Sequence, residues 1–227
     1  MWAIDHQTTW NPAPTSVAAP LLIGMRRTTR YERFVKPCID RALALVLAIV
    51  LLPVVVLVAI VTRLSVGPNI ILHQTRIGRD GEPLTLRKFR TMHPDRREPG
   101  STTFAGEDRR RTHKHANDPR LTRVGKVLRT WSLDELPQLF DVLSGRLSVV
   151  GPRPELPEIV ARYEPWQHAR HAVKPGITGL WQIKARGNGE MHEHTEFDIA
   201  YAQCVTFLSD LKILLLTIPA VLAHRGY

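Results

Sequence analysis

An unbroken apolar segment from Ala42 to Val61 constrains the fold of this chain more than any other feature. It contains no charged or strongly polar side chain, and as a helix it is about long enough to cross the hydrocarbon core of a bilayer. It begins too far from Met1 and is too long for the apolar part of a cleaved signal peptide. We therefore expect a membrane-bound protein that keeps this segment.

Pro53 lies near the middle of the apolar segment. In a straight helix it would remove one hydrogen bond and clash with the preceding turn, at a cost of about 3 kcal/mol. Basic residues flank both ends of the segment, so a single span would place one basic end on the unfavoured side of the membrane. A helix that bends at Pro53 and returns to the same face accounts for both observations. A kinked span is the alternative, because prolines are tolerated in membrane helices.

The rest of the chain divides into three parts. Residues 1–33 contain scattered prolines and are expected to be a mobile leader, residues 34–66 the membrane segment, and residues 67–227 a cytoplasmic domain. The basic residues from Arg26 to Arg41 mark the cytoplasmic side, because they suit anionic headgroups. Cys38 and Cys204 are far apart with no metal-like spacing, which indicates free, reduced thiols.

Local patterns predict a mainly helical α/β domain. Strand-like residues at 70–72 and 84–92, on either side of an Asp80-Gly81 turn, predict a hairpin in which Lys88 and Arg90 share one face and Phe89 the other. Helical spacing occurs at 121–128, at 136–143 and from Phe197 to Leu211. The last pattern is expected to pack on the core or lie in the membrane interface. The charged segment 94–117 is expected to be a flexible loop.

The adjacent acids Asp134 and Glu135 stand out in a chain whose net charge is +10. That charge suits nucleic acid, lipid headgroups or a phosphorylated metabolite, and the sign alone does not choose among them. The spacing Ser132-x-x-Glu135 favours a helix capping box. Pro137 weakens that interpretation, because it would clash within a helix capped at Ser132.

The functional alternative is that one carboxylate attacks phosphorus and the other holds Mg²⁺. Two like charges about 4 Å apart repel by about 4 kcal/mol near a protein surface, so the acids would need cations beside them. Candidates are Arg129, Arg153, which two prolines restrict, and the Lys88/Arg90 face. A structural ion pair at Arg153 and a solvated face at Lys88 and Arg90 remain open.

Two further segments are ambiguous. The Gly- and Pro-containing stretch from Lys174 to Gln182 is either a loop under a base or sugar or a plain structural turn. The stretch from Met191 to His194 lacks the histidine spacing of a helical zinc site, so metal binding is not expected there.

Taken together, these residues closely resemble the bacterial sugar transferase family, small monotopic phosphoglycosyl transferases that act on polyprenyl phosphate. The resemblance covers about Phe34 to Leu222 and is highly specific, because several blocks occur in the right order. They are Gln74-x-Arg76-x-Gly78-x-x-Gly81, Lys88 to Met92, Asn117 to Arg120, Leu128-Arg129, Ser132 to Leu139, Val150 to Pro154, Lys174 to Gln182 and Asp198-x-x-Tyr201 followed by Asp210-Leu211.

The resemblance implies a two-step reaction with a nucleotide sugar, usually a UDP-sugar. The family's aspartate, Asp134 here, attacks the β-phosphate and releases UMP, and undecaprenyl phosphate then displaces the sugar-phosphate. Glu135 would be the Mg²⁺-associated acid, with Asp134 beside the metal, and Arg129, Arg153, Lys88 and Arg90 would contact phosphate or nucleotide. The product would be the first membrane-bound intermediate of exopolysaccharide or glycan synthesis.

The resemblance also implies a re-entrant helix with its break at Pro53, on the cytoplasmic face of the bacterial inner membrane. Family members commonly have serine before this proline, whose hydroxyl can bond a preceding carbonyl, whereas this chain has Leu52. The expected partners are a nucleotide sugar, undecaprenyl phosphate and membrane lipid, with a second copy of the chain as a further candidate and no nucleic acid. A membrane-tethered basic binding or scaffold protein without catalysis is the alternative.

Overall fold

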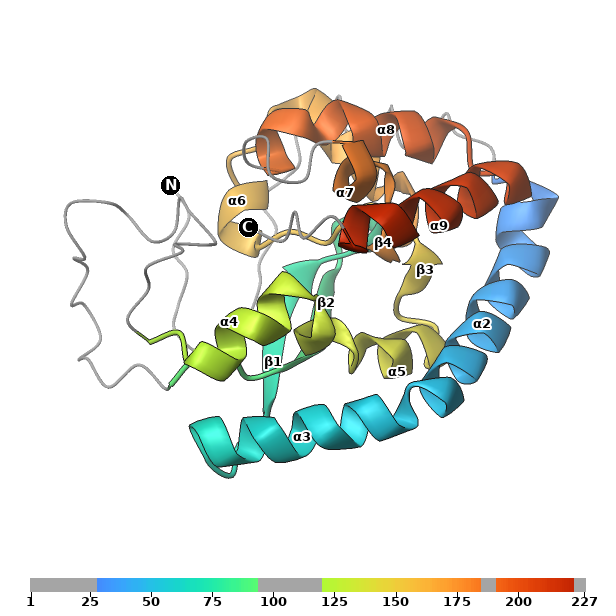
Figure 1. Ribbon diagram of the computed structural model, residues 1–227. Helices are drawn as coiled ribbons and strands as arrows, with labels where there is room; N and C mark the ends of the chain where they lie inside the picture. The colour runs from blue at the N-terminus through green and yellow to red at the C-terminus, as the bar shows by residue number, and fades with distance from the viewer. Residues whose placement is uncertain (1–27, 94–119, 185–190, 223–227) are drawn as a thin grey trace.

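The computed structural model describes residues 28–93, 120–184 and 191–222, and the structural statements below refer to these residues. Helices dominate, and two small two-stranded sheets accompany them (Figure 1). The expected mainly helical α/β class is therefore confirmed. Most of the predicted leader, and all of the predicted loop at 94–117, lie outside the described residues.

The apolar segment forms two helices that meet at a sharp bend. A π-helical turn, η1 (Tyr31–Val35), leads into α2 (Lys36–Val50), and α3 (Leu52–Val66) follows at 65°. Pro53 lies in the first turn of α3, where its missing N–H would have had no helical partner. The break predicted at Pro53 is confirmed, although Leu52 replaces the serine that would favour it.

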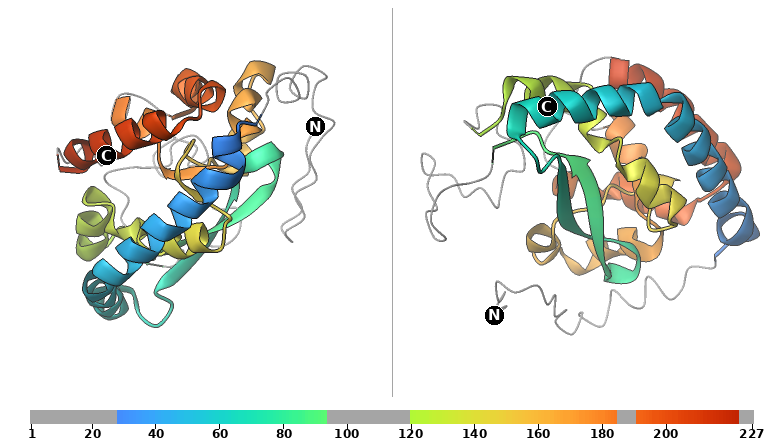
Figure 2. Two further views of the ribbon diagram at one scale, coloured as in Figure 1. Left: turned by 90° about the vertical axis from the view of Figure 1, so that its right-hand side faces the viewer. Right: turned by 90° about the horizontal axis from the view of Figure 1, so that it is seen from below.

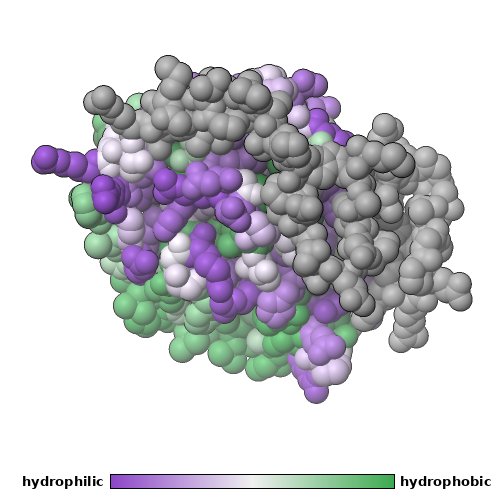
Figure 3. Space-filling view, turned by 180° about the vertical axis from the view of Figure 1, so that it is seen from behind, coloured by the Kyte–Doolittle hydropathy of each residue, from purple (hydrophilic) through white to green (hydrophobic). Residues whose placement is uncertain are grey.

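In the described part of the chain, no single helix has the length and apolar character needed to cross a bilayer, and only this bent pair satisfies both together. The pair follows the right and lower edges of the molecule in Figure 1 and forms a bent arm beside the hairpin when seen from below (Figure 2). An apolar band also runs along the lower edge in Figure 3. Exposed apolar side chains of the pair include Leu45, Val46, Ile49, Val50, Leu52, Leu57, Ile60 and Leu64.

The predicted hairpin is present, with a longer first strand and a shorter second strand than expected. Strands β1 (Ile71–Ile77) and β2 (Pro83–Phe89) pair antiparallel, with Ile71 opposite Phe89. A 3₁₀ turn, η2 (Arg79–Gly81), joins them. Phe89 is only 4% exposed and packs with Val58 of α3 and Leu128. Its side chain therefore lies on the other face of the strand from that of Lys88, as predicted.

The remaining elements are short. Helix α4 (Arg123–Thr130), the 3₁₀ turn η3 (Leu133–Glu135) and α5 (Gln138–Leu143) precede a parallel pair of strands, β3 (Ser148–Val150) and β4 (Gly176–Thr178). Helix α6 (Pro157–Val160) and the 3₁₀ helix η4 (Pro165–Ala172) connect those strands. The last described elements are α7 (Leu180–Lys184), η5 (Met191–His194), α8 (Thr195–Gln203) and α9 (Phe207–Leu222).

Two local expectations were wrong. The stretch 174–182 is not a plain turn or loop, because it contributes β4 and the start of α7. The single helical pattern predicted from Phe197 to Leu211 is broken between Gln203 and Phe207, where non-helical backbone at Cys204 separates α8 from α9. Both cysteines are free, as expected, and both are exposed.

Polar side chains of α2 form hydrogen bonds that connect the bent helix pair to the rest of the fold. Asp210 of α9 accepts hydrogen bonds from Tyr31 at 2.7 Å, Lys36 at 2.6 Å and Tyr201 at 2.7 Å. Asp40 accepts one from Ser148 of β3 at 2.6 Å. Ala44, one turn further along α2, is fully buried in the main hydrophobic core. Helix α2 is therefore part of the folded domain as well as of the apolar arm.

Candidate functional site

The acidic pair lies on a tight turn and not at the start of a helix. Ser132 adopts a left-handed backbone conformation, with φ of 56°, and its side chain makes no capping hydrogen bond. Asp134 and Glu135 follow in the 3₁₀ turn η3, and α5 begins only at Gln138, immediately after Pro137. The capping box that the spacing favoured is therefore wrong. The turn ends before α5 starts, which also places Pro137 where its ring is tolerated.

Glu135 is held by two cations from different parts of the chain. Lys88 of β2 donates to its Oε1 at 2.8 Å, while Arg153 donates from Nη2 to Oε1 at 2.5 Å and from Nη1 to Oε2 at 3.2 Å. Burial alone would raise the pKa of Glu135, but the charges of Arg153 and Lys88 outweigh it and hold that pKa well below its usual value. Glu135 is therefore a fixed negative charge.

Asp134 has a different environment, although it is the adjacent residue. Its side chain is largely buried, with the residue 9% exposed, and it forms no hydrogen bond or ion pair with any described residue. Burial and the neighbouring charge of Glu135 raise its pKa, against the opposing influence of Lys88, Arg129 and Arg153. The carboxylate of Asp134 thus keeps its lone pairs available for a ligand.

Arg129 approaches the acidic pair from the last turn of α4. Its Nε donates to Oγ1 of Thr91 at 2.9 Å, and Thr91 is 5% exposed. Helix α4 lies very close to this residue, since a Cβ added at Gly125 would come within 2.0 Å of the carbonyl oxygen of Thr91. No role for Thr91 was predicted, although it belongs to the Lys88–Met92 block that carried the resemblance.

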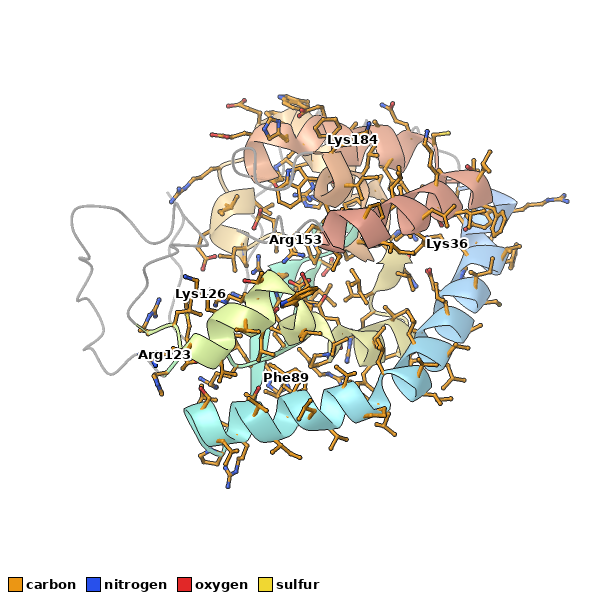
Figure 4. All side chains as sticks on the ribbon, viewed as in Figure 1. Lys36, Phe89, Arg123, Lys126, Arg153 and Lys184 are labelled. Atoms are coloured by element: carbon orange, nitrogen blue, oxygen red, sulfur yellow. The ribbon has the colours of Figure 1, made fainter. Side chains whose placement is uncertain are left out.

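Arg90 is not joined to the acidic pair by any contact among the described residues. Strand β2 ends at Phe89, and the Nε of Arg90 donates to the carbonyl oxygen of Asn69 at 2.8 Å. The structure therefore brings together Asp134, Glu135, Lys88 and Arg153, with Arg129 beside them. Figure 4 shows Arg153 near the centre of the molecule, beside the end of α4.

A second set of charged residues fixes the Pro152–Pro154 segment. Arg170 donates to the carbonyl oxygen of Arg153 at 2.6 Å and pairs with the fully buried Asp198. Glu155, which is 1% exposed, pairs with Arg76 at 3.3 Å. Burial lowers the pKa of Arg76 to about 10. Sequence reasoning assigned these residues no role, although Arg76 and Asp198 occur in the blocks that carried the resemblance.

Comparison with known proteins decides the family. The family model for bacterial sugar transferases matches residues 31–224 of this chain. The chain belongs to the bacterial sugar transferase family. It is therefore an enzyme of the sugar transferase class, and the matched region includes both bent helices and every residue of the candidate site.

Individual relatives agree with this assignment. The chain is 42% identical over 166 residues to the uncharacterized sugar transferase EpsL of Bacillus subtilis, covering 73% of this chain and 76% of that protein. It is 38% identical over 196 residues to the exopolysaccharide production protein ExoY of Sinorhizobium fredii, covering 84% and 87%. It is also 38% identical over 198 residues to the UDP-glucose:undecaprenyl-phosphate glucose-1-phosphate transferase of Escherichia coli, covering 82% of this chain and 40% of that protein.

The donor set of this sugar transferase suits Mg²⁺ better than a transition metal. The described residues contain no cluster of three His, Cys, Asp or Glu side chains that could hold a metal. Mg²⁺ needs only one or two protein carboxylates when phosphate oxygens complete its shell. The unpaired carboxylate of Asp134 could supply one ligand, and Oε2 of Glu135, which accepts a single hydrogen bond at 3.2 Å, could supply another. The residues present therefore fit this ion.

Proposed function

We propose that this sugar transferase moves a sugar-1-phosphate from a UDP-sugar to undecaprenyl phosphate, through a covalent intermediate on Asp134. The products are UMP and an undecaprenyl-diphosphate sugar, the first membrane-bound intermediate of an exopolysaccharide or glycan. The observation that carries the proposal is the contrast within the acidic pair. Glu135 is occupied by Lys88 and Arg153, whereas Asp134 has no such partner among the described residues.

In the first step, a carboxylate oxygen of Asp134 attacks the β-phosphorus of the UDP-sugar. The bond from that phosphorus to the bridging oxygen breaks, and UMP leaves with the oxygen and its electron pair. In the second step, an oxygen of undecaprenyl phosphate attacks the same phosphorus and the Asp134 carboxylate leaves unchanged. An acylphosphate of this kind divides one displacement between two highly charged phosphates into two separate steps.

The surrounding residues supply positive charge for both steps. Arg129, Lys88 and Arg153 lie close enough to Asp134 to influence its pKa, so they also lie close to any phosphate bound there. Arg153 is the most constrained of the three, because its guanidinium is fixed by Glu135 and its backbone carbonyl by Arg170. Mg²⁺, held by Asp134 and Glu135 when bound, would offset part of the diphosphate charge.

The proposal is tested by measuring UMP release from a panel of UDP-sugars with purified protein, undecaprenyl phosphate and Mg²⁺. Intact-mass measurement without the acceptor should detect a sugar-phosphate adduct. Asp134→Asn should abolish both signals, while Glu82→Gln, which neutralises an exposed acid, should leave them unchanged. An adduct that persists in Asp134→Asn would mean that another residue attacks. No turnover with any donor would favour a binding or scaffold protein.

The bent helix pair supports a second part of the proposal. We infer that α2 and α3 enter the cytoplasmic face of the bacterial inner membrane and return to it, so that the protein is monotopic. The bend of 65° and the exposed apolar side chains of both helices support this topology. Cys38 and a cysteine introduced at the exposed Leu64 should then react with an impermeant thiol reagent from the same face, in a Cys204→Ser background. Labelling from opposite faces would indicate that the helix pair spans the membrane.

A further inference from the structure

A second cluster of cations surrounds a cavity away from the acidic pair. The cavity has a volume of about 40 Å³ and lies between the start of α2, the hairpin turn η2 and the segments that follow α5 and η4. No residue of the candidate active site lines it. In Figure 4, Lys36, which does line it, lies near α9 and well away from Arg153. Its charged lining consists of Lys36, Arg41, Arg79 and Lys174, with Glu32 and Asp40.

Two of these charged residues, Lys36 and Asp40, already form ion pairs and hydrogen bonds within the fold. Lys36 is held by Asp210 at 2.6 Å and lies 3.7 Å from Asp40. Asp40 also accepts hydrogen bonds from the hydroxyl of Ser148 and the backbone N–H of Val149. Lys36 and Asp40 therefore stabilise the attachment of α2. The residues with donors left for a ligand are Arg41, Arg79 and Lys174.

Arg41 and Lys174 converge on one point of the backbone. The Nζ of Lys174 donates to the carbonyl oxygen of Gly145 at 2.9 Å, which uses one of its three protons. The Nη2 of Arg41 lies within 2.7 Å of the position that a Cβ at Gly145 would take. Within the described residues, Arg41 forms one hydrogen bond, a long one of 3.5 Å to the carbonyl oxygen of Pro37. A glycine at 145 thus leaves room for two cationic heads beside each other.

Positive charge outweighs negative charge in the cavity lining, which has four cationic side chains and two acidic ones. Burial, followed by the positive charges of Arg41 and Arg79, lowers the pKa of Lys174. Among the described residues, the ion pair of Arg79 is with the exposed acid Asp80, at 3.3 Å, which is not part of the cavity lining. Like charges gathered in a partly buried space repel one another, and a bound anion would relieve that repulsion.

We propose that this cavity binds a phosphate group, whose oxygens are held by Arg41, Arg79 and Lys174. A tetrahedral phosphate presents several oxygens to cations that converge from different directions, and arginine forms charge-assisted hydrogen bonds with it. A phospholipid headgroup and a soluble phosphate compound share this chemistry. The position beside the first turns of α2, whose later turns expose apolar side chains, suits either source.

The test uses the full-length protein in detergent, with inorganic phosphate as the soluble probe and vesicles containing phosphatidylglycerol in phosphatidylcholine as the lipid probe. Calorimetry follows the first probe and vesicle flotation the second. The variants are Arg41→Gln, Arg79→Gln and both together. These side chains are not part of the buried ion pairs, so the variants should fold, which thermal unfolding verifies. Arg162→Gln removes an exposed arginine outside the cavity and is the matched control.

Wild-type protein and Arg162→Gln should bind one of the two probes, and each cavity variant should bind it about tenfold more weakly, because a charge-assisted hydrogen bond is lost. If the cavity variants bind inorganic phosphate more weakly than wild type, the ligand is a soluble phosphate compound. If they lose only vesicle binding, the ligand is a lipid headgroup. Equal binding by all variants, or a loss that Arg162→Gln shares, would overturn the proposal, as would wild-type protein that binds neither probe. Catalytic turnover is not part of this readout, so its outcome is independent of the proposed reaction.

Discussion

Arg153 and Glu135 form a two-point ion pair, with distances of 2.5 Å and 3.2 Å between the guanidinium nitrogens and the two carboxylate oxygens. Prolines on both sides restrict the backbone of Arg153, and Lys88 binds the same carboxylate from β2. The pair therefore fixes an arginine beside Asp134 before any substrate arrives. Such preorganisation stabilises charge in a transition state without rearrangement during the reaction.

Replacing Arg153 with lysine should lower activity although the charge is kept. Lysine cannot form the planar two-point contact with Glu135, so its head would be less well fixed. Losing one charge-assisted hydrogen bond should reduce kcat/KM for UMP release about tenfold or more. Arg162→Lys, at an exposed position, should behave as wild type. An unchanged kcat/KM in Arg153→Lys would show that charge alone is sufficient at this position.

Asp134→Asn should make the protein more stable at neutral pH while abolishing its activity. The folded-state pKa of Asp134 is raised, so its stabilising contribution is complete below the ordinary value of 3.8 and is lost as pH rises through the raised value. Asparagine avoids that loss. Each 1 kcal/mol gained would raise Tm by about 2–4 °C.

Thermal unfolding of wild type and Asp134→Asn across pH would measure this effect. The two curves should meet near and below pH 3.8 and separate as pH increases. A variant that is less stable than wild type at neutral pH would mean that the attraction of Lys88, Arg129 and Arg153 exceeds the cost of burial.

Thr91 should act as a positioning residue for Arg129. Thr91→Val keeps the shape of the side chain but removes the acceptor for the Nε of Arg129, at a cost of about 1 kcal/mol. Turnover should fall about fivefold, which corresponds to that energy. Thr91→Ser retains the hydroxyl and should recover most of the activity. Equal losses in the valine and serine variants would mean that the hydrogen bond to Arg129 does not by itself explain the effect.

Asp210 should contribute strongly to stability although it lies outside the candidate active site. Asp210→Asn leaves the buried Lys36 without its close ion-pair partner, which should lower the free energy of unfolding by about 3 kcal/mol. Denaturant unfolding would measure this, with Asp80→Asn as the exposed control, expected to change it by less than about 1 kcal/mol. Adding Lys36→Met to Asp210→Asn should restore part of the loss. If the double variant has a lower free energy of unfolding than Asp210→Asn, the result would contradict the ion pair between Lys36 and Asp210.

The sequence was most informative where strong local constraints act on the backbone. Pro53 predicted the bend between α2 and α3, and the Asp80-Gly81 turn predicted the hairpin. Lys88 was placed opposite Phe89 by the two-residue period of a strand, and the structure shows that arrangement. These features depend on neighbours within a few residues, which a sequence pattern records directly.

Features that depend on contacts between residues distant in the sequence were harder to predict. The capping interpretation of Ser132 failed because spacing does not reveal a left-handed backbone at that residue. Neither the joint binding of Glu135 by Lys88 and Arg153 nor the hydrogen bond from Arg129 to Thr91 could be derived from spacing, because β2, α4 and the Pro152–Pro154 segment meet only in three dimensions. The family blocks contained all of these residues without indicating which ones touch.

The packing of α2 also bears on how the enzyme could be handled and altered. Deleting the helices up to Val66 to obtain a water-soluble fragment would remove Lys36 and Asp40, expose the surface that covers Ala44, and leave Asp210 without its cation. A shortened protein of that kind should misfold. Solubility would be better sought by exchanging the outward-facing apolar side chains of α2 and α3, which leaves the inner face intact.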